Sequence, residues 1–186
     1  MKNIYCLLLM ISSIAKAQSP VVSFSDYFDN DTDYIENMYI KDTEHVLNPY
    51  IGVWTWVEGD SSLVIDIQFV EMSYREAVSK YYIDELVGRI KYIENGTIIF
   101  NGLLTGEEIL KLSKPMPRNG TIGFSHKDPL IADKYGYVTI ELINNGNQIK
   151  FFLRNNEGSR LILPGAPAFD PEFSMPRQTY FILDKF

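Results

Sequence analysis

Histidines and adjacent carboxylates are the residues of this chain that could do acid–base or metal chemistry. The chain contains two histidines, in the clusters Asp42-Thr43-Glu44-His45 and His126-Lys127-Asp128. Both clusters fall in predicted turns, where a solvated or capping histidine is far commoner than a ligand. The sequence has no H-x-x-x-H pair for zinc and no G-x-S-x-G elbow for a serine nucleophile. These histidines therefore predict no catalytic centre.

The carboxylates offer candidates by residue type alone. Asp84-Glu85 and Glu107-Glu108 could act as a glycosidase pair, but with 24 acidic residues adjacency carries little information. Asp29, Asp31 and Asp33 are spaced like the start of a calcium loop. An EF-hand needs Gly at the sixth position and Glu at the twelfth, where this chain has Tyr34 and Ile40. We therefore expect a solvated acidic turn, no metal, no cofactor and no enzymatic activity.

The first 17 residues are expected to be a signal peptide. Lys2 supplies a positive start, residues 4–14 are apolar, and Ala15-Lys16-Ala17 forms a small-x-small cleavage site before Gln18. The apolar run is too short to span a bilayer, so we expect no membrane insertion. Cys6 lies inside this run rather than at the first mature position, where a lipid anchor would need it. The sequence predicts an exported protein, periplasmic or extracellular.

Composition after cleavage limits the possible partners and stabilising bonds. Cys6 is the single cysteine, so the mature chain would have no disulfide, thiolate nucleophile or cysteine metal site. Cleavage also removes two of the 17 basic residues, which changes the net charge from −7 to −9. An acidic surface opposes binding to nucleic acid or to anionic lipid. A chain of this size can form one self-sufficient core.

Residues 50–70 are the clearest structural signal and predict a β-hairpin. Trp54 and Trp56 lie on one face of the first strand, and apolar residues alternate with polar ones after the turn at 58–61. Asn-Gly turns predict two further hairpins, which pair 86–93 with 97–104 and 135–143 with 148–154. Residues 159–163 could add a strand, and 178–184 read as a closing strand.

This order of hairpins predicts an all-β fold. We expect a single antiparallel up-and-down barrel of eight or nine strands, because closure removes exposed sheet edges. A two-sheet β-sandwich is the alternative. The predicted organisation is a signal peptide at 1–17, an N-terminal extension and lead-in turn at 18–49, and the barrel at 50–186. Residues 71–82 are open between strand, helix and loop, and loops are predicted at 113–119, 126–134 and 164–176.

Two resemblances accompany this interpretation. Gly52-x-Trp54 after a short helical turn resembles the opening of the lipocalin and wider calycin barrels, which implies a lipocalin-like closed barrel. The other lipocalin signatures are not evident. A second similarity spans most of the chain, to an uncharacterised family of small exported bacterial proteins known as a domain of unknown function. It implies a fold and an export route, and its residues are Ile40–Thr43, Leu47–Trp54, Asp84–Gly88 and Tyr92–Gly96.

Two functions stay open. The first is a non-catalytic binding protein with a small apolar ligand in the barrel, lined by Trp54, Trp56, Tyr92, Tyr137 and Phe151. The same aromatic residues could instead fill the barrel as its core. The second is a protein-interaction module, an inhibitor or accessory factor, that uses Pro-rich loops with Phe169 and Phe173. Those loops could instead cap the end of the barrel.

Overall fold

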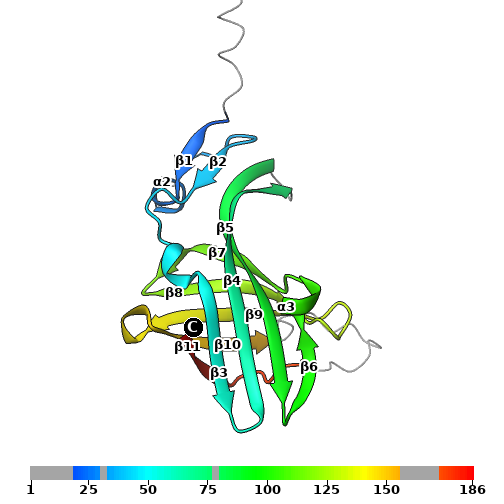
Figure 1. Ribbon diagram of the computed structural model, residues 1–186. Helices are drawn as coiled ribbons and strands as arrows, with labels where there is room; N and C mark the ends of the chain where they lie inside the picture. Colours follow the sequence, from blue (N-terminus) through cyan, green and yellow to red (C-terminus); the bar gives the residue numbers. More distant parts are fainter. Residues whose placement is uncertain (1–18, 30–32, 77–79, 156–171) are drawn as a thin grey trace, which may run out of the picture.

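Eight antiparallel strands close into a barrel (Figure 1). The computed structural model describes residues 19–29, 33–76, 80–155 and 172–186. The barrel closes where β11 pairs with β3 and β5 pairs with β7. The predicted antiparallel barrel is therefore confirmed, and the sandwich alternative is wrong. Its strands are β3 (Gly52–Glu58), β4 (Ser61–Glu76), β5 (Lys80–Glu94), β7 (Leu110–Arg118), β8 (Thr121–Lys127), β9 (Tyr135–Ile143), β10 (Gln148–Asn155) and β11 (Tyr180–Lys185).

The hairpins predicted from turn residues are present. β3 pairs with β4, so that Trp54 lies opposite Ile65. β5 pairs with β6 (Thr97–Asn101) across Asn95 and Gly96, whose φ angles of 49° and 76° match a hairpin turn with two left-handed residues. β9 pairs with β10 around the 3₁₀ turn η2 (Asn144–Gly146). Local turn chemistry therefore sets the register of these pairs.

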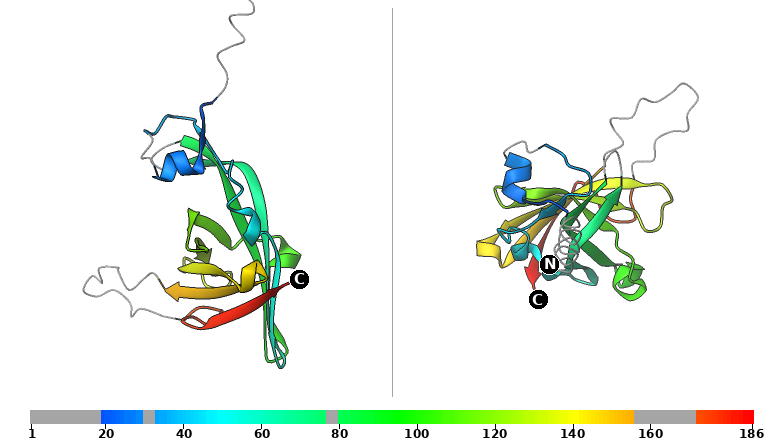
Figure 2. Two further views of the ribbon diagram at one scale, coloured as in Figure 1. Left: turned by 90° about the vertical axis from the view of Figure 1, so that its left-hand side faces the viewer. Right: turned by 90° about the horizontal axis from the view of Figure 1, so that it is seen from above.

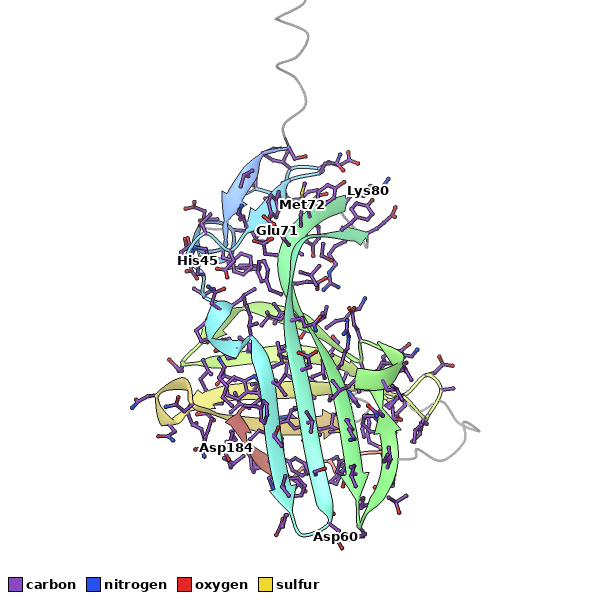
Figure 3. The ribbon with its side chains drawn as sticks, viewed as in Figure 1. His45, Asp60, Glu71, Met72, Lys80 and Asp184 are labelled. Atoms are coloured by element: carbon purple, nitrogen blue, oxygen red, sulfur yellow. The ribbon has the colours of Figure 1, made fainter. Side chains whose placement is uncertain are left out.

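The hairpin β4–β5 extends far beyond the barrel. Its strands are 16 and 15 residues long, so the open segment 71–82 is a continuation of both strands in its described part. A bulge between Val70 and Ser73 interrupts the pairing, and Met72 has φ of 57° there. Figure 3 places Glu71 and Met72 in the part that rises above the barrel, with Asp60 at the opposite end of the hairpin. We call this part, residues 71–76 of β4 and 80–84 of β5, the upper hairpin. It stands clear of the barrel wall.

An N-terminal arm, in its described residues 19–29 and 33–47, packs onto this upper hairpin. It contains β1 (Val21–Ser23), helix α2 (Phe24–Asp29) and β2 (Tyr39–Lys41). β1 pairs with β2 and β2 pairs with β5, both in parallel. In Figure 2 (left), α2 lies above the barrel on the same side of the long hairpin as β7. The 3₁₀ turn η1 (Asn48–Tyr50) then leads into β3, as the predicted lead-in turn requires.

Four predicted segments differ from the structure or lie wholly or mostly outside the described residues. The predicted loop 113–119 is largely strand, because β7 continues to Arg118 with register shifts around Pro115 and Pro117. β8 likewise includes His126. The possible strand 159–163 and most of the loop 164–176 lie outside the described residues. The short helix α3 (Gly102–Thr105) joins β6 to β7, and no helix in the described part is long and apolar enough to cross a membrane.

One apolar core runs from the barrel into the arm. Within the barrel, the fully buried side chains include Trp54, Phe124 and Phe151. The same cluster continues upward to Phe24 and Met38 of the arm. The arm is therefore part of the folded unit, because Phe24 and Met38 belong to the same buried cluster as the apolar residues of the barrel.

Candidate ligand pocket at the neck

The barrel interior is occupied by the aromatic residues that were candidates for a ligand site. Trp54, Tyr92 and Phe151 are all buried. Trp56 is half-buried, and its ring lies edge-on to Phe181 with centroids 4.8 Å apart. Large side chains that pack on one another in this way act as core, which is the alternative that the sequence left open. Their role as ligand contacts stays a prediction.

Tyr137 does not share the inner face with these residues. Its neighbours Val138 and Ile140 are buried, whereas Tyr137 projects from the other side of β9. Its ring covers Gly123 of β8, where an added Cβ would overlap the Tyr137 hydroxyl. Tyr137 therefore belongs to the outer wall, and the alternation along β9 was the signal that could have placed it there.

Phe173 is a capping residue of the barrel rather than part of an exposed patch. It is 8% exposed, and its ring centroid lies 5.8 Å from that of His126. The ammonium of Lys134 also lies over the Phe173 ring, 5.0 Å from its centroid. This burial favours the cap of the barrel end over an interaction site at Phe173, while Phe169 lies outside the described residues.

The two histidines lie in opposite environments. His45 is exposed in a turn of the arm, as expected. His126 is fully buried, so the expectation of a solvated turn is wrong there. Neither of its ring nitrogens has a hydrogen-bond partner within the described part of the chain. Burial lowers the pKa of His126 to about 4 against the opposing charge of Asp128, so the ring is neutral near pH 7.

Asp84 is a buried carboxylate that fastens the arm to the hairpin. Its Oδ1 accepts hydrogen bonds from the Tyr39 hydroxyl (2.5 Å) and the Met72 N–H (3.0 Å), and its Oδ2 accepts one from the Asp42 N–H (3.0 Å). Burial, and then the bond to Asp84, raises the pKa of Tyr39, so that hydroxyl stays a donor. Asp84 therefore joins β2, the bulge of β4, and β5.

Asp42 extends the same network into the turn that follows β2. Its carboxylate accepts hydrogen bonds from the N–H groups of Val46 (2.9 Å) and Leu47 (3.0 Å). Both Asp42 and Asp84 are buried. Their oxygens are occupied by backbone and tyrosine donors, which marks them as structural carboxylates.

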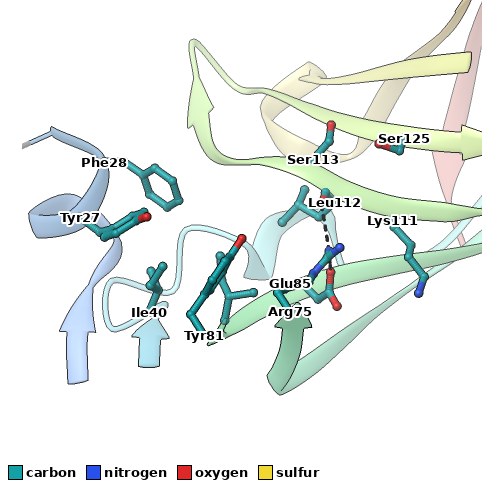
Figure 4. A pocket seen from close by; sticks show the side chains of 11 residues that line it. Tyr27, Phe28, Ile40, Arg75, Tyr81, Glu85, Lys111, Leu112, Ser113 and Ser125 are labelled. Carbon is teal, nitrogen blue, oxygen red and sulfur yellow. Dashed lines mark hydrogen bonds and ion pairs between the residues drawn. The ribbon is translucent and has the colours of Figure 1, made fainter. Parts of the chain in front are cut away.

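A cavity of about 400 Å³ lies at the neck, between the arm, the upper hairpin and the rim of the barrel. Figure 4 shows α2 and β2 on one side and β7 and β8 on the other. We call this cavity the neck pocket. Its lining residues come from five strands and one helix: Tyr27, Phe28, Ile40, Arg75, Tyr81, Ile83, Glu85, Lys111, Leu112, Ser113 and Ser125.

An ion pair forms the polar side of the neck pocket. Glu85 is 4% exposed and accepts hydrogen bonds from the Ser73 hydroxyl and the Arg75 guanidinium. The same Arg75 nitrogen also donates to the Leu112 carbonyl at 3.3 Å. These contacts place Arg75 between β4, β5 and β7, with about a third of its side chain (32%) still exposed.

Aromatic residues form the opposite side. The rings of Tyr27 and Phe28 meet edge-on at 4.9 Å between centroids. Burial, together with the neighbouring hydroxyls of Tyr81 and Tyr34, raises the pKa of Tyr27, which keeps its hydroxyl neutral. Tyr81 lies opposite Arg75 in the β4–β5 register, so an aromatic ring and a guanidinium stand side by side on one face.

Lys111 and two serines complete the barrel side of the neck pocket. Lys111 lies opposite Ser125 in the β7–β8 register, so both side chains leave the same face of the wall. The Ser113 hydroxyl donates to the Gly123 carbonyl at 3.1 Å. The described lining contains no histidine or cysteine, and no group of three metal-ligating side chains occurs in the described chain. The arrangement offers polar contacts for a ligand on this side of the pocket.

The sequence interpretation missed Arg75 and Lys111. Ser73 and Arg75 are two apart, as are Tyr81, Ile83 and Glu85, so each set shares a face once both segments are strands. Residues 71–82 were left unassigned, which hid this alternation. Glu85 appeared only as a carboxylate adjacent to Asp84.

A family model described as "Family of unknown function (DUF6705)" matches residues 1–185. The chain belongs to this family. The resemblance to an uncharacterised family is thus confirmed, while membership assigns no activity or functional residue to the chain. No curated protein and no solved structure matches it.

Proposed function

We propose that this protein is a non-catalytic binding protein that holds one small, mainly apolar ligand in the neck pocket. The observation that carries the proposal is a cavity of about 400 Å³ with an aromatic wall on the arm and polar groups on the barrel. This volume falls within the range of small-molecule sites, which combine an apolar lining with a few placed polar groups. The buried aromatic residues of the barrel make the neck a better location than the interior.

Export is part of this proposal. Residues 1–17 have the pattern of a signal peptide, and the protein would then meet its ligand outside the cytoplasm. The intact mass of the protein isolated from its own host tests this, with a first residue at Gln18 as the expected result. A mass that includes residues 1–17 would contradict export by cleavage at this site.

Fluorescence titration with N-phenyl-1-naphthylamine, a neutral apolar probe, tests the pocket. We expect saturable enhancement with the natural protein and its loss in Ser125→Trp, because Ser125 is exposed on the pocket wall and an indole would fill the cavity. Thr121→Trp is the matched control, since Thr121 projects from the same face of β8 outside the lining. Equal binding by both variants would place the probe elsewhere and refute the proposal.

Native mass spectrometry of protein from its own host gives a second measurement. A small molecule that co-purifies with the natural protein and not with Ser125→Trp would identify the ligand directly. The protein-interaction alternative is not carried forward, because Phe173 is buried against His126.

A further inference from the structure

The charges of the neck pocket are opposite in sign to those of the whole chain. The lining holds two cations, Arg75 and Lys111, and one anion, Glu85. The chain as a whole carries a net charge of −7. A local positive excess on an acidic protein does not follow from composition, so it marks a place where an anion is favoured.

Glu85 is already satisfied within the protein. Its two oxygens accept from Ser73 and Arg75, and the residue is almost completely buried. A cationic ligand would therefore have to displace Arg75 from a buried carboxylate, which is costly. Glu85 serves as the group that fixes the guanidinium in place.

Arg75 and Lys111 keep donors for a ligand. The hydrogen bonds of Arg75 to Glu85 and Leu112 use one terminal nitrogen, which leaves the other N–H groups of the guanidinium for a ligand, and part of the side chain is exposed. Lys111 is exposed and forms no ion pair among the described residues. A carboxylate matches the guanidinium edge, and charge-assisted bonds of this type are stronger than neutral ones.

We infer that the ligand of the neck pocket is an amphipathic carboxylate, whose acid group lies at Arg75 and Lys111 and whose apolar body lies against Tyr27, Phe28 and Tyr81. This inference rests on the proposed function, because it names the ligand class of the same pocket. Tyr27 and Phe28 lie on α2, across the cavity from Arg75 and Lys111, and Tyr81 lies beside Arg75 on the hairpin, so one molecule with an acid at one end contacts both groups (Figure 4).

Competition against N-phenyl-1-naphthylamine tests the inference with 4-phenylbutyrate, its amide and 4-phenylbutylamine, which share one body and differ in the head group. The carboxylate should displace the probe at a concentration at least about tenfold lower than the amide. Lys111→Met should remove most of this preference. Lys127→Met should retain it, because Lys127 carries the same charge on β8 outside the lining.

Each other result overturns the inference. Equal displacement by acid and amide, or strongest displacement by the amine, would exclude an anion site while the proposed function stands on probe binding. Equal loss of preference in the two lysine variants would show a general charge effect instead of a contact. If the probe does not bind at all, the proposed function fails and the inference fails with it.

Discussion

Asp84 carries the connection between the arm and the hairpin through three hydrogen bonds to one buried carboxylate. Asp84→Asn keeps the shape but replaces one acceptor oxygen by a donor that faces other donors. We expect the free energy of unfolding to fall by about 2–4 kcal/mol. Urea unfolding followed by circular dichroism measures this change.

Asp66→Asn is the matched control for Asp84. Asp66 is half-buried on the barrel and accepts a bond from Gln68 at 2.7 Å. An asparagine oxygen can still accept that bond, so a change below about 1 kcal/mol is expected. A similar loss in both variants would show that the three hydrogen bonds of Asp84 contribute no more to stability than the single bond of Asp66.

His126 predicts a fall in stability below neutral pH. Its pKa is about 4 in the folded protein and 6.5 as the ordinary value, so the unfolded chain binds the proton first. This contribution to stability is fully present above pH 6.5 and is lost as the pH falls toward 4. The free energy of unfolding lost over this whole pH range is about 3 kcal/mol. Urea unfolding at pH 7.5 and pH 4.5 measures it against the background of the carboxylates.

His126→Phe removes that group while keeping a ring beside Phe173. Because both ring nitrogens of His126 lack partners in the described chain, the phenyl ring should be neutral or stabilising at pH 7.5. The difference between the two pH values should shrink by about 3 kcal/mol relative to the natural protein. An unchanged difference would mean that His126 does not titrate with unfolding.

Residue roles were the least predictable part of this protein. Sequence spacing distinguishes the two faces of a strand, which suffices for Trp54 and would have sufficed for Tyr137. It cannot tell that Asp84 accepts bonds from Tyr39 and Asp42, because those partners lie more than 40 residues away along the chain. The burial of His126 depends on Phe173, which follows it in the sequence only after strands β9 and β10.

Among the elements, the closure between β5 and β7 depends on a glycine. A Cβ at Gly88 would lie 2.9 Å from Leu110 Cδ1, and Leu110 is the residue opposite in the register. Gly88→Ala should therefore lower the free energy of unfolding by about 1–3 kcal/mol. Chemical denaturation gives the value.

A double-mutant cycle with Leu110→Ala checks the cause. Leu110→Ala removes Cδ1 and Cγ but keeps Cβ, which lies 3.0 Å from the added methyl group. Gly88→Ala should therefore cost less in that background than in the natural protein. The same cost in both backgrounds would show that the outer atoms of the Leu110 side chain are not the cause.

Elements set by local chemistry were predictable, and those set by distant pairing were not. The turn at Asn95-Gly96 is predictable from its own two residues, since both tolerate positive φ. The upper hairpin has no such local signal. Its bulge shifts the alternation of side chains, and its β5 strand pairs in parallel with β2, which is distant in the sequence. In β7, Pro115 and Pro117 indicate an interruption of regular pairing, and the strand contains it as register shifts rather than ending there.

On the scale of the whole molecule, ligand binding should stiffen two separate regions at once. The neck pocket joins α2 in the arm to β7 in the barrel. Hydrogen exchange in the presence of 4-phenylbutyrate should slow in peptides that cover 24–29 and 110–113. Peptides from β9 should not change. Protection confined to β9 and β10 would place the ligand inside the barrel.

The seam between β11 and β3 has a consequence for when this protein can fold. Asp184 pairs with Thr55, and the N–H of Phe186 donates to the Val53 carbonyl at 2.9 Å. Closure therefore joins residues about 130 positions apart, and such long loops slow folding. Before β11 has been synthesised, the chain contains the other strands of the barrel with two open sheet edges, and the barrel can close only after β11 emerges. Loss of even these few residues would leave β3 as a template for aggregation.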